Sequence, residues 1–399
     1  MNSKDTIDVM VQKANLALEK YMKMDQKKVD EIVSKMTQAA IDNSEKLALM
    51  AFEETKKGNF KDKISKNIFA SKNVFDSIKN EKTVGIINEN KSEGVIEIAD
   101  PLGVIAGVTP VTNPTSTVIF KALICAKTRN PIIFGFHPGA KNCCIETAKI
   151  LRDAAISAGA PEDLIQWVEE PSIEATSSLM NHPGVAVVLA TGGAAMVKSA
   201  YSTGKPALGV GPGNVPCYIE KTANVQRACE DILLSKTFDN GMICASEQSV
   251  IVDKEVSQKF EDVAKKLGFY FLSDSEAKKL SGFIFNEANG KLNVKIVGQS
   301  ACDIAKMADI SVPKDTKILV AKLDRADSDV PLSAEKLSPI LGYFISNDSN
   351  EAFKICESIL DFGGRGHTAS IHSENSEVIK NFGLKMIAGR ILVNTPSSQ

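Results

Sequence analysis

One cysteine of this chain stands where a reactive thiol would be placed. Cys244 lies in "SKTFDNGMICASEQSVIVD" (residues 235–253), between a Gly-Met-Ile segment and a polar run that leads into an expected strand. A cysteine thiolate attacks carbonyl carbons readily, but free cysteine is also among the most buried residue types. Taken alone, Cys244 is therefore either an inert buried thiol or a nucleophile.

Two loops carry groups that could meet a ligand. "VTPVTNPTST" (108–117) sets Asn113 and several hydroxyls just before an expected helix, which suits either ligand donors or a helix cap. "LATGG" ends in Gly192 and Gly193 before another helix, which suits a diphosphate or a plain tight turn. The full G-x-G-x-x-G fingerprint is absent.

Two further loops are rich in glycine, which lets a backbone approach a flat ligand or merely turn a corner. They are "GVGPGNVP" (209–216) and "FGGRGHTA" (362–369), and the second presents His367. The eight cysteines form no Cys-x-x-Cys pair and no Cys/His group with zinc spacing. We therefore expect no metal site.

Strands and helices alternate through the middle of the chain. The expected strands are the short apolar runs at 103–108, 131–136, 164–168 and 185–190, and the expected helices are 115–128, 140–158 and 172–181. Apolar runs without alternation are typical of strands covered on both faces. This α/β pattern predicts a doubly wound, parallel, Rossmann-type sheet that binds ligands at the carboxyl ends of its strands.

The remaining segments complete a two-domain plan. About eighty helical residues come first, with apolar positions that include Val9, Ala14, Leu16 and Leu18. A hairpin follows, either a simple edge hairpin or an arm that pairs with another subunit. A second α/β unit comes last. The expected domains are 1–83 with 100–222, the hairpin 84–99, and a second domain 223–399.

Composition excludes several classes of protein. At 399 residues the chain is long enough for two cores. The net charge of −2 gives no nucleic-acid footprint, and the lysines of 56–66 alternate with acidic residues, as on a solvated face. No apolar run spans a membrane and no signal peptide is visible, so the sequence favours a cytoplasmic protein in a reducing compartment.

Taken together, the motifs resemble a known family. "TNPTST", "KTRNPIIF", "LATGG", "GMICASEQ", "EKLSPIL", "GHTA" and "RILVNTPSSQ" occur in the order found in the aldehyde dehydrogenase superfamily. Within it the chain is similar to the CoA-acylating acetaldehyde dehydrogenases, and above all to the N-terminal half of the bifunctional aldehyde–alcohol dehydrogenases of fermenting bacteria. The likeness covers essentially the whole chain and implies an NAD-binding domain followed by a catalytic α/β domain.

The resemblance also implies roles for particular residues. Cys244 matches the nucleophile, and Asn113 matches the amide that joins the Cys244 backbone N–H as an oxyanion hole. His367 either handles the proton of the coenzyme A thiol or anchors its loop. The positions that match NAD contacts are Val108, Thr109, Pro110, Val111, Thr112, Asn113, His137, Gly193, Gly211 and Glu335.

A missing carboxylate indicates the acyl acceptor. Hydrolysing aldehyde dehydrogenases carry a glutamate base in the loop that matches 209–216, where this chain has Gly209 and no carboxylate. Attack by water on a Cys244 thioester would lack its base, whereas a thiol is already partly ionised at neutral pH. We therefore expect an oxidoreductase that interconverts acetaldehyde, or another short aldehyde, plus CoA and NAD⁺ with acetyl-CoA and NADH, as in ethanol fermentation.

The chain stops at "NTPSSQ", whereas relatives continue into a glycine-rich tail and, in the bifunctional proteins, an iron-dependent alcohol dehydrogenase domain. We therefore expect no second activity and no iron site here. Two alternatives remain. One is an inactive, truncated nucleotide-binding remnant that pairs with a full-length relative; the other is a reductase of acyl phosphates. The superfamily implies a homo-oligomer built through the hairpin, with neither nucleic acid nor membrane as a partner.

Overall fold

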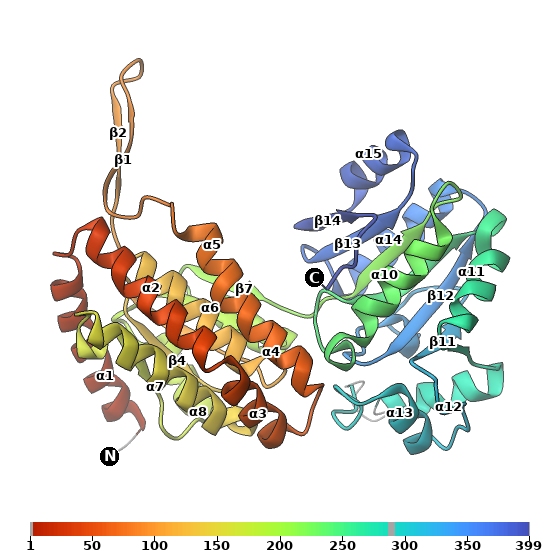
Figure 1. Cartoon of the computed structure of the whole chain (residues 1–399), viewed down its shortest axis with the longest axis horizontal. Coiled ribbons are helices and arrows are strands. Elements are labelled where there is room, and N and C mark those ends of the chain that lie inside the picture. Colours follow the sequence, from red (N-terminus) through yellow and green to blue (C-terminus); the bar gives the residue numbers. More distant parts are fainter. Residues whose placement is uncertain (1–2, 286–291, 399) are drawn as a thin grey trace. The chain divides into compact units, whose positions relative to one another are not determined.

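The computed structural model describes residues 3–285 and 292–398, and Figure 1 shows the course of the chain. The chain divides into two compact units. The first comprises Met1–Lys56 and Phe60–Gly211, and the second comprises Lys57–Asn59 and Pro212–Gln399.

The division between the units falls earlier than the sequence indicated. We expected the second domain to begin at residue 223, but the units divide between Gly211 and Pro212. The reason is strand β8 (Val215–Ile219), which pairs with β9 (Glu247–Asp253) and β13 (Thr368–His372). Its backbone hydrogen bonds therefore place β8 in the second sheet.

The first unit contains the expected parallel sheet. Its strands lie in the order β5-β4-β3-β6-β7, and every pair in it is parallel. Taken along the chain, this is the order third, second, first, fourth, fifth of a Rossmann-type sheet, as predicted. The bounds are β3 (Val104–Val108), β4 (Ile132–Gly135), β5 (Ile165–Trp167), β6 (Val185–Thr191) and β7 (Ala207–Val210).

Helices cover both faces of this sheet, as a doubly wound fold requires. One core cluster joins the sheet to α2, α3, α6 and α7, and another joins it to α1 and α8. The bounds are α1 (Ser3–Tyr21), α2 (Gln26–Asp42), α3 (Ser44–Thr55), α4 (Phe60–Ile68), a π-helix (Phe69–Asn73), α5 (Val74–Ile78), α6 (Pro114–Lys127), α7 (Lys141–Ser157), α8 (Ile173–Asn181) and α9 (Ala194–Tyr201).

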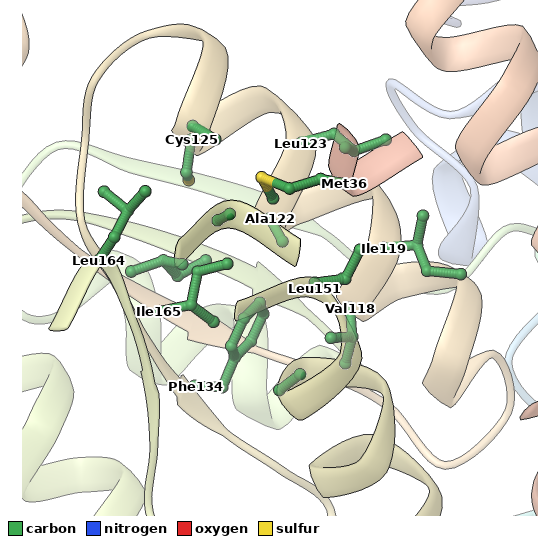
Figure 2. Packing of buried hydrophobic residues seen from close by; sticks show 14 of the residues in the cluster. Met36, Val118, Ile119, Ala122, Leu123, Cys125, Phe134, Leu151, Leu164 and Ile165 are labelled. Carbon is green, nitrogen blue, oxygen red and sulfur yellow. The ribbon is translucent and has the colours of Figure 1, made fainter. Parts of the chain in front are cut away.

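Figure 2 shows the larger of these two cores at close range. Leu151 of α7 is fully buried and lies among Phe134, Val118, Ile119 and Ile165, side chains from two strands and from helix α6. Apolar surface removed from water in this way is the main favourable contribution to folding. The packing therefore fixes the sheet whose edge carries the candidate binding loops.

Leu151→Ala is expected to lower the free energy of unfolding by about 2–5 kcal/mol, because it removes buried methyl groups and leaves a cavity. Urea denaturation of the purified chain measures the change. Ile173→Ala is the matched control, since Ile173 is 86% exposed and its loss should change stability by less than about 0.5 kcal/mol. Equal, small losses in both variants would contradict this packing.

The expected hairpin forms and stands away from the rest of the first unit (Figure 1). Strands β1 (Gly85–Asn90) and β2 (Val95–Ala99) pair with each other in a two-stranded antiparallel sheet. Its apolar side chains face outward: Ile86, Ile96 and Ile98 are each more than half exposed. Exposed apolar side chains on an unpaired strand edge suit contact with a further strand.

The second unit is built on a seven-stranded sheet in the order β10-β11-β12-β9-β8-β13-β14, with all pairs parallel. The expected second α/β unit is confirmed. The other elements are α10 (Val225–Thr237), α11 (Lys254–Lys266), β10 (Phe269–Phe271), α12 (Asp274–Ile284), α13 (Ala301–Met307), β11 (Ile318–Lys322), β12 (Ile340–Ser346), α14 (Ser349–Gly363), α15 (Ser376–Lys385) and β14 (Arg390–Val393). Over the described residues, no helix is both long and apolar enough to cross a bilayer.

Candidate functional site

In the first unit, two candidate loops lie next to each other at the carboxyl ends of the strands. The loop from Thr109 to Asn113 follows β3, and Gly192 and Gly193 follow β6. Strands β3 and β6 are neighbours, and their connections run to opposite sides, so this edge is the topological switch point of the sheet. Ligands of open α/β sheets bind in the crevice that such a point creates.

The glycine at the start of α9 leaves room for a ligand. Gly193 is the N-cap of this helix, and a Cβ built on it would meet no atom within 4 Å. An open helix N-terminus with its backbone N–H groups suits a diphosphate. Within the loop after β3, Val108 and Thr109 are buried, so they can offer only backbone atoms to a ligand.

Position 209, by contrast, has no room for a side chain. A Cβ on Gly209 would lie 2.7 Å from Val197 and 2.9 Å from Tyr201. A glutamate at this position would therefore require the Val197 and Tyr201 side chains to move.

A buried lysine that the sequence analysis missed joins the two strands of the switch point. Lys121 of α6 is 3% exposed, and its Nζ donates to the carbonyl of Val108 at 2.5 Å and to that of Leu189 at 2.7 Å. Burial lowers the pKa of Lys121 to about 7. The Lys121 Nζ thus joins the ends of β3 and β6 at the base of the candidate loops.

His137 lies in an exposed turn after β4. Its Nδ1 accepts a hydrogen bond from the backbone N–H of Gly139 at 3.0 Å, which caps the short 3₁₀ turn Pro138–Ala140. One ring nitrogen of His137 is therefore used to stabilise this turn.

The lysines of 56–66 are not a uniformly solvated face, contrary to our expectation. Lys63 is 3% exposed and Lys66 is 9% exposed. Lys66 Nζ donates to Asn113 Oδ1 at 2.7 Å. The alternating acidic residues suggested a solvated stretch, but helix α4 turns these two lysines inward, toward the loop before α6.

In the second unit, exposure separates Cys244 from most other thiols. Six of the eight cysteines are buried, and only Cys244 and Cys302 are partly exposed. Burial raises the pKa of Cys125 and of Cys229 to about 12, which keeps these buried thiols protonated. Exposure therefore makes Cys244 a candidate nucleophile.

The segment before Cys244 has an unusual backbone. Asp239, Asn240 and Gly241 all have positive φ angles, of 49°, 55° and 70°. Two of these residues are not glycine, and consecutive left-handed residues are costly unless the surroundings hold them. Asn240 is held by its side chain, which donates to the carbonyl of Gly298 at 3.0 Å. Such strain is commonly found at functional sites.

Three loops converge on Cys244. A Cβ on Gly213 would lie 1.8 Å from the carbonyl oxygen of Cys244 and 3.3 Å from His367 Cε1. The backbone N–H of Gly213 donates to Glu335 Oε1 at 2.9 Å. The second unit thus brings together Cys244, Glu335 and His367 through Gly213, although 91 residues separate the first pair in the chain and 32 separate the second.

The electrostatics around Glu335 and His367 follow from burial. Desolvation raises the pKa of Glu335 to about 7, against the attraction of Lys236 and Lys336. Burial, with a smaller effect of Arg390, lowers the pKa of His367, so its ring is neutral at pH 7. His367 Nδ1 lies 3.0 Å from Thr368 Oγ1. A neutral, partly buried imidazole is able to accept a proton.

A buried polar network supports these loops. Gln248 Oε1 accepts from Lys236 Nζ at 3.1 Å and from the backbone N–H of Lys336 at 3.0 Å. All three residues are fully buried. Gln248 lies at the start of β9, so the network ties the strand after Cys244 to the loop that carries Glu335.

Ser397 is a second positioning contact that the sequence analysis missed. It is fully buried, and its Oγ donates to the carbonyl of Ala245, next to Cys244, at 2.6 Å. Its backbone N–H donates to Glu247 Oε1 at 3.1 Å. No sequence signal singled it out beyond its place in "NTPSSQ", because a serine after a proline is typical of any loop.

The predicted site residues therefore form two sets. The second unit assembles Cys244, Glu335 and His367, and the first unit places the loop up to Asn113 and Gly193 at one sheet edge. His137 lies beyond the neighbouring strand β4, and Gly211 is the last residue of the first unit. Within residues 3–285 and 292–398, no three His, Cys, Asp or Glu side chains gather as a metal site.

Comparison with known proteins agrees with this arrangement. Residues 1–268 match the Aldehyde dehydrogenase family. The Aldehyde-alcohol dehydrogenase 2 of Entamoeba histolytica is 51% identical over 100% of this chain and 47% of its own length. This chain thus spans about half the length of this and other curated aldehyde-alcohol dehydrogenases that it matches.

Solved structures cover more of their own chains. An acetylating aldehyde dehydrogenase from Geobacillus thermoglucosidasius has a TM-score of 0.96 and 47% identity, over 99% of this chain and 87% of that chain. A propionaldehyde dehydrogenase from Rhodopseudomonas palustris, solved with bound CoA and an acylated cysteine, has a TM-score of 0.87 and 29% identity over 98% and 88%. The chain belongs to the aldehyde dehydrogenase family.

Proposed function

We propose that this chain carries an NAD-dependent, CoA-acylating aldehyde dehydrogenase activity. The observation that carries the proposal is the setting of Cys244, whose thiol is partly exposed and whose backbone carbonyl lies against Gly213, the residue that also neighbours the His367 ring. The acylated cysteine of the Rhodopseudomonas palustris relative supports the same role for Cys244. Acetaldehyde is the proposed substrate, because the Geobacillus relative is an acetylating enzyme.

The proposed reaction begins at Cys244. Its thiolate adds to the aldehyde carbon and the carbonyl π electrons move onto oxygen, where Asn113 and the Cys244 backbone N–H are the proposed donors to the new oxyanion. Bound NAD⁺ supplies the hydride acceptor. Loss of hydride from the adduct leaves a thioester on Cys244. Preorganised donors are usually the largest source of stabilisation for such an oxyanion.

Coenzyme A is the proposed acyl acceptor. His367, neutral at pH 7, is the proposed base that takes the proton of the CoA thiol. The CoA sulfur then attacks the thioester carbon, and Cys244 leaves as a thiolate. Gly209 supports transfer to a thiol over hydrolysis, because this position carries no carboxylate to activate water and an added side chain would crowd Val197 and Tyr201.

For NAD, the residues present fit the cofactor. The switch point of the first sheet and the open N-terminus of α9 at Gly193 suit a dinucleotide diphosphate. Glu335 is the proposed partner of the nicotinamide ribose; its carboxyl is held by the Gly213 N–H. The remaining proposed contacts are Val108, Thr109, Pro110, Val111, Thr112, Asn113, His137 and Gly211.

We also propose a homo-oligomer and a cytoplasmic location. The exposed apolar hairpin of β1 and β2 is the proposed contact between subunits, because its strand edges are unpaired in the two-stranded sheet. All eight cysteines, each within the described part of the chain, are free thiols, as expected in a reducing compartment.

The test is NADH formation from acetaldehyde and NAD⁺ with CoA, with inorganic phosphate, and with neither acceptor. We expect steady turnover only in the reaction that contains CoA, measured by the absorbance of NADH. Turnover with phosphate instead would favour a reductase of acyl phosphates. A folded chain that binds NADH, measured by fluorescence, but does not turn over with either acceptor would instead be a nucleotide-binding protein.

A further inference from the structure

The asparagine before helix α6 does not behave as a helix cap. Asn113 occupies the N-cap position of α6, yet its side chain makes no capping hydrogen bond. An asparagine at this position normally accepts from a backbone N–H of the first turn. Here Oδ1 accepts from Lys66 Nζ at 2.7 Å instead. The amide oxygen is therefore paired with the lysine and not with the helix.

This contact fixes which way the amide faces. A lysine ammonium has only donors, so the amide atom that it contacts must be the oxygen. The Nδ2 atom, with its two N–H donors, is turned to the other side. One of them faces Thr112 Oγ1, at 3.3 Å. The amide thus turns its N–H donors away from Lys66, and an N–H donor is what a developing oxyanion needs.

Lys66 lies in a buried part of helix α4 that is hydrogen-bonded to the start of α6. Lys66 is 9% exposed, and the next residue, Asn67, is fully buried. Asn67 Oδ1 accepts from Thr115 Oγ1 at 2.7 Å, and its Nδ2 donates to the carbonyl of Ser44 at 3.0 Å. Lys66 and Asn67, two successive residues of α4, therefore form hydrogen bonds to the residues on either side of Pro114 at the start of α6.

The backbone of this segment has a further mark of a specialised site. Helix α4 runs directly into a π-helical turn, Phe69–Asn73. Such turns are rare and occur frequently at functional sites. A hollow beside the contact is lined by Lys63, Lys66, Thr112, Asn113 and Ser116. Donors from α4 and from the loop before α6 thus gather around one small space.

We propose that Lys66 is a positioning residue for the oxyanion step. It locks the Asn113 amide with its N–H groups outward, and its positive charge polarises the amide so that these groups donate more strongly. The proposal rests on the proposed role of Asn113 as an oxyanion donor. It deepens that role by naming the group that orients the donor.

The test compares Lys66→Met, Lys66→Arg, Asn113→Ala and the double variant in the full chain. We expect Lys66→Met to lower kcat for aldehyde oxidation about 10–100-fold. This loss should not exceed the loss in Asn113→Ala, which removes the donor itself. Lys66→Arg should recover part of this loss, because it keeps a charged donor. Alkylation of Cys244 should not change. Lys61→Met, an exposed lysine on the same helix, should match wild type.

Two readouts separate orientation from mere support of the fold. Adding Lys66→Met to Asn113→Ala should cost nothing further, because a residue that acts through the amide has no effect once the amide is gone. In a crystal structure of Lys66→Met, the Asn113 amide should rotate to cap α6. Additive losses, or an unrotated amide with wild-type kcat, would overturn the proposal. A rotated amide in a chain whose wild type is inactive would refute the proposed function alone.

Discussion

Cys244→Ala is expected to lower CoA-dependent NADH formation by at least about 10⁴-fold, because no other group can form the thioester. The substitution removes one sulfur from a partly exposed position, so the fold and NADH binding should be retained. Steady-state absorbance measures the activity, and circular dichroism and NADH fluorescence confirm that the variant is folded.

The matched control is Cys302→Ala. Cys302 is the other partly exposed cysteine, and its Sγ contacts the carbonyl of Thr316 at 3.4 Å. We expect Cys302→Ala to keep wild-type activity and to leave one iodoacetamide-reactive thiol, which aldehyde turnover should protect. Retained activity in Cys244→Ala, or equal losses in both variants, would rule out Cys244 as the nucleophile.

Much of the fold could be predicted because buried parallel strands leave a plain signal. The apolar runs at 103–108, 131–136, 164–168 and 185–190 all became strands of the first sheet. Strand β7 was missed, since its alternating exposure and glycine at 209 give no continuous apolar run. Periodicity in the first helix was also misleading: Val9 and Leu16 are exposed, and Ile7, Val11 and Ala14 form the buried face.

The candidate site was predictable where a residue type is chemically distinctive. Cys244 and Glu335 stood out by type and motif, and the second unit brings them together through Gly213. Lys66, Lys121 and Ser397 were missed because lysine and serine are usually surface residues. Only tertiary packing shows that these three are buried and aimed at backbone or amide oxygens.

The end of the sheet at which the site lies was predicted for the first unit but not for the second. In the first unit the loops lie at the carboxyl ends of the strands, as expected for open α/β sheets. In the second unit Cys244, Gly213 and His367 all precede their strands β9, β8 and β13, so they lie at the amino ends. These ends meet because the three strands are adjacent and parallel.

Gly213→Ala is expected to lower kcat about 100-fold, because the added methyl must displace the loop that carries the nucleophile. Its Cβ would lie 1.8 Å from the Cys244 carbonyl oxygen and 2.8 Å from the carbonyl carbon. Both are backbone atoms and cannot rotate away, so the chain itself must move. A misplacement of about 1 Å at a reacting centre is enough for a loss of this size.

The same displacement should weaken the Gly213–Glu335 hydrogen bond, so the KM for NAD⁺ should rise together with the fall in kcat. Urea denaturation should show a loss of about 1–3 kcal/mol from overpacking. Gly383→Ala is the control: Gly383 lies in helix α15, a Cβ there meets nothing within 4 Å, and alanine favours the helix. If Gly213→Ala kept wild-type kcat and KM, the activity of Cys244 would not depend on this close approach of the two loops. The contact between Gly213 and Cys244 would then no longer support the role of Cys244 as nucleophile.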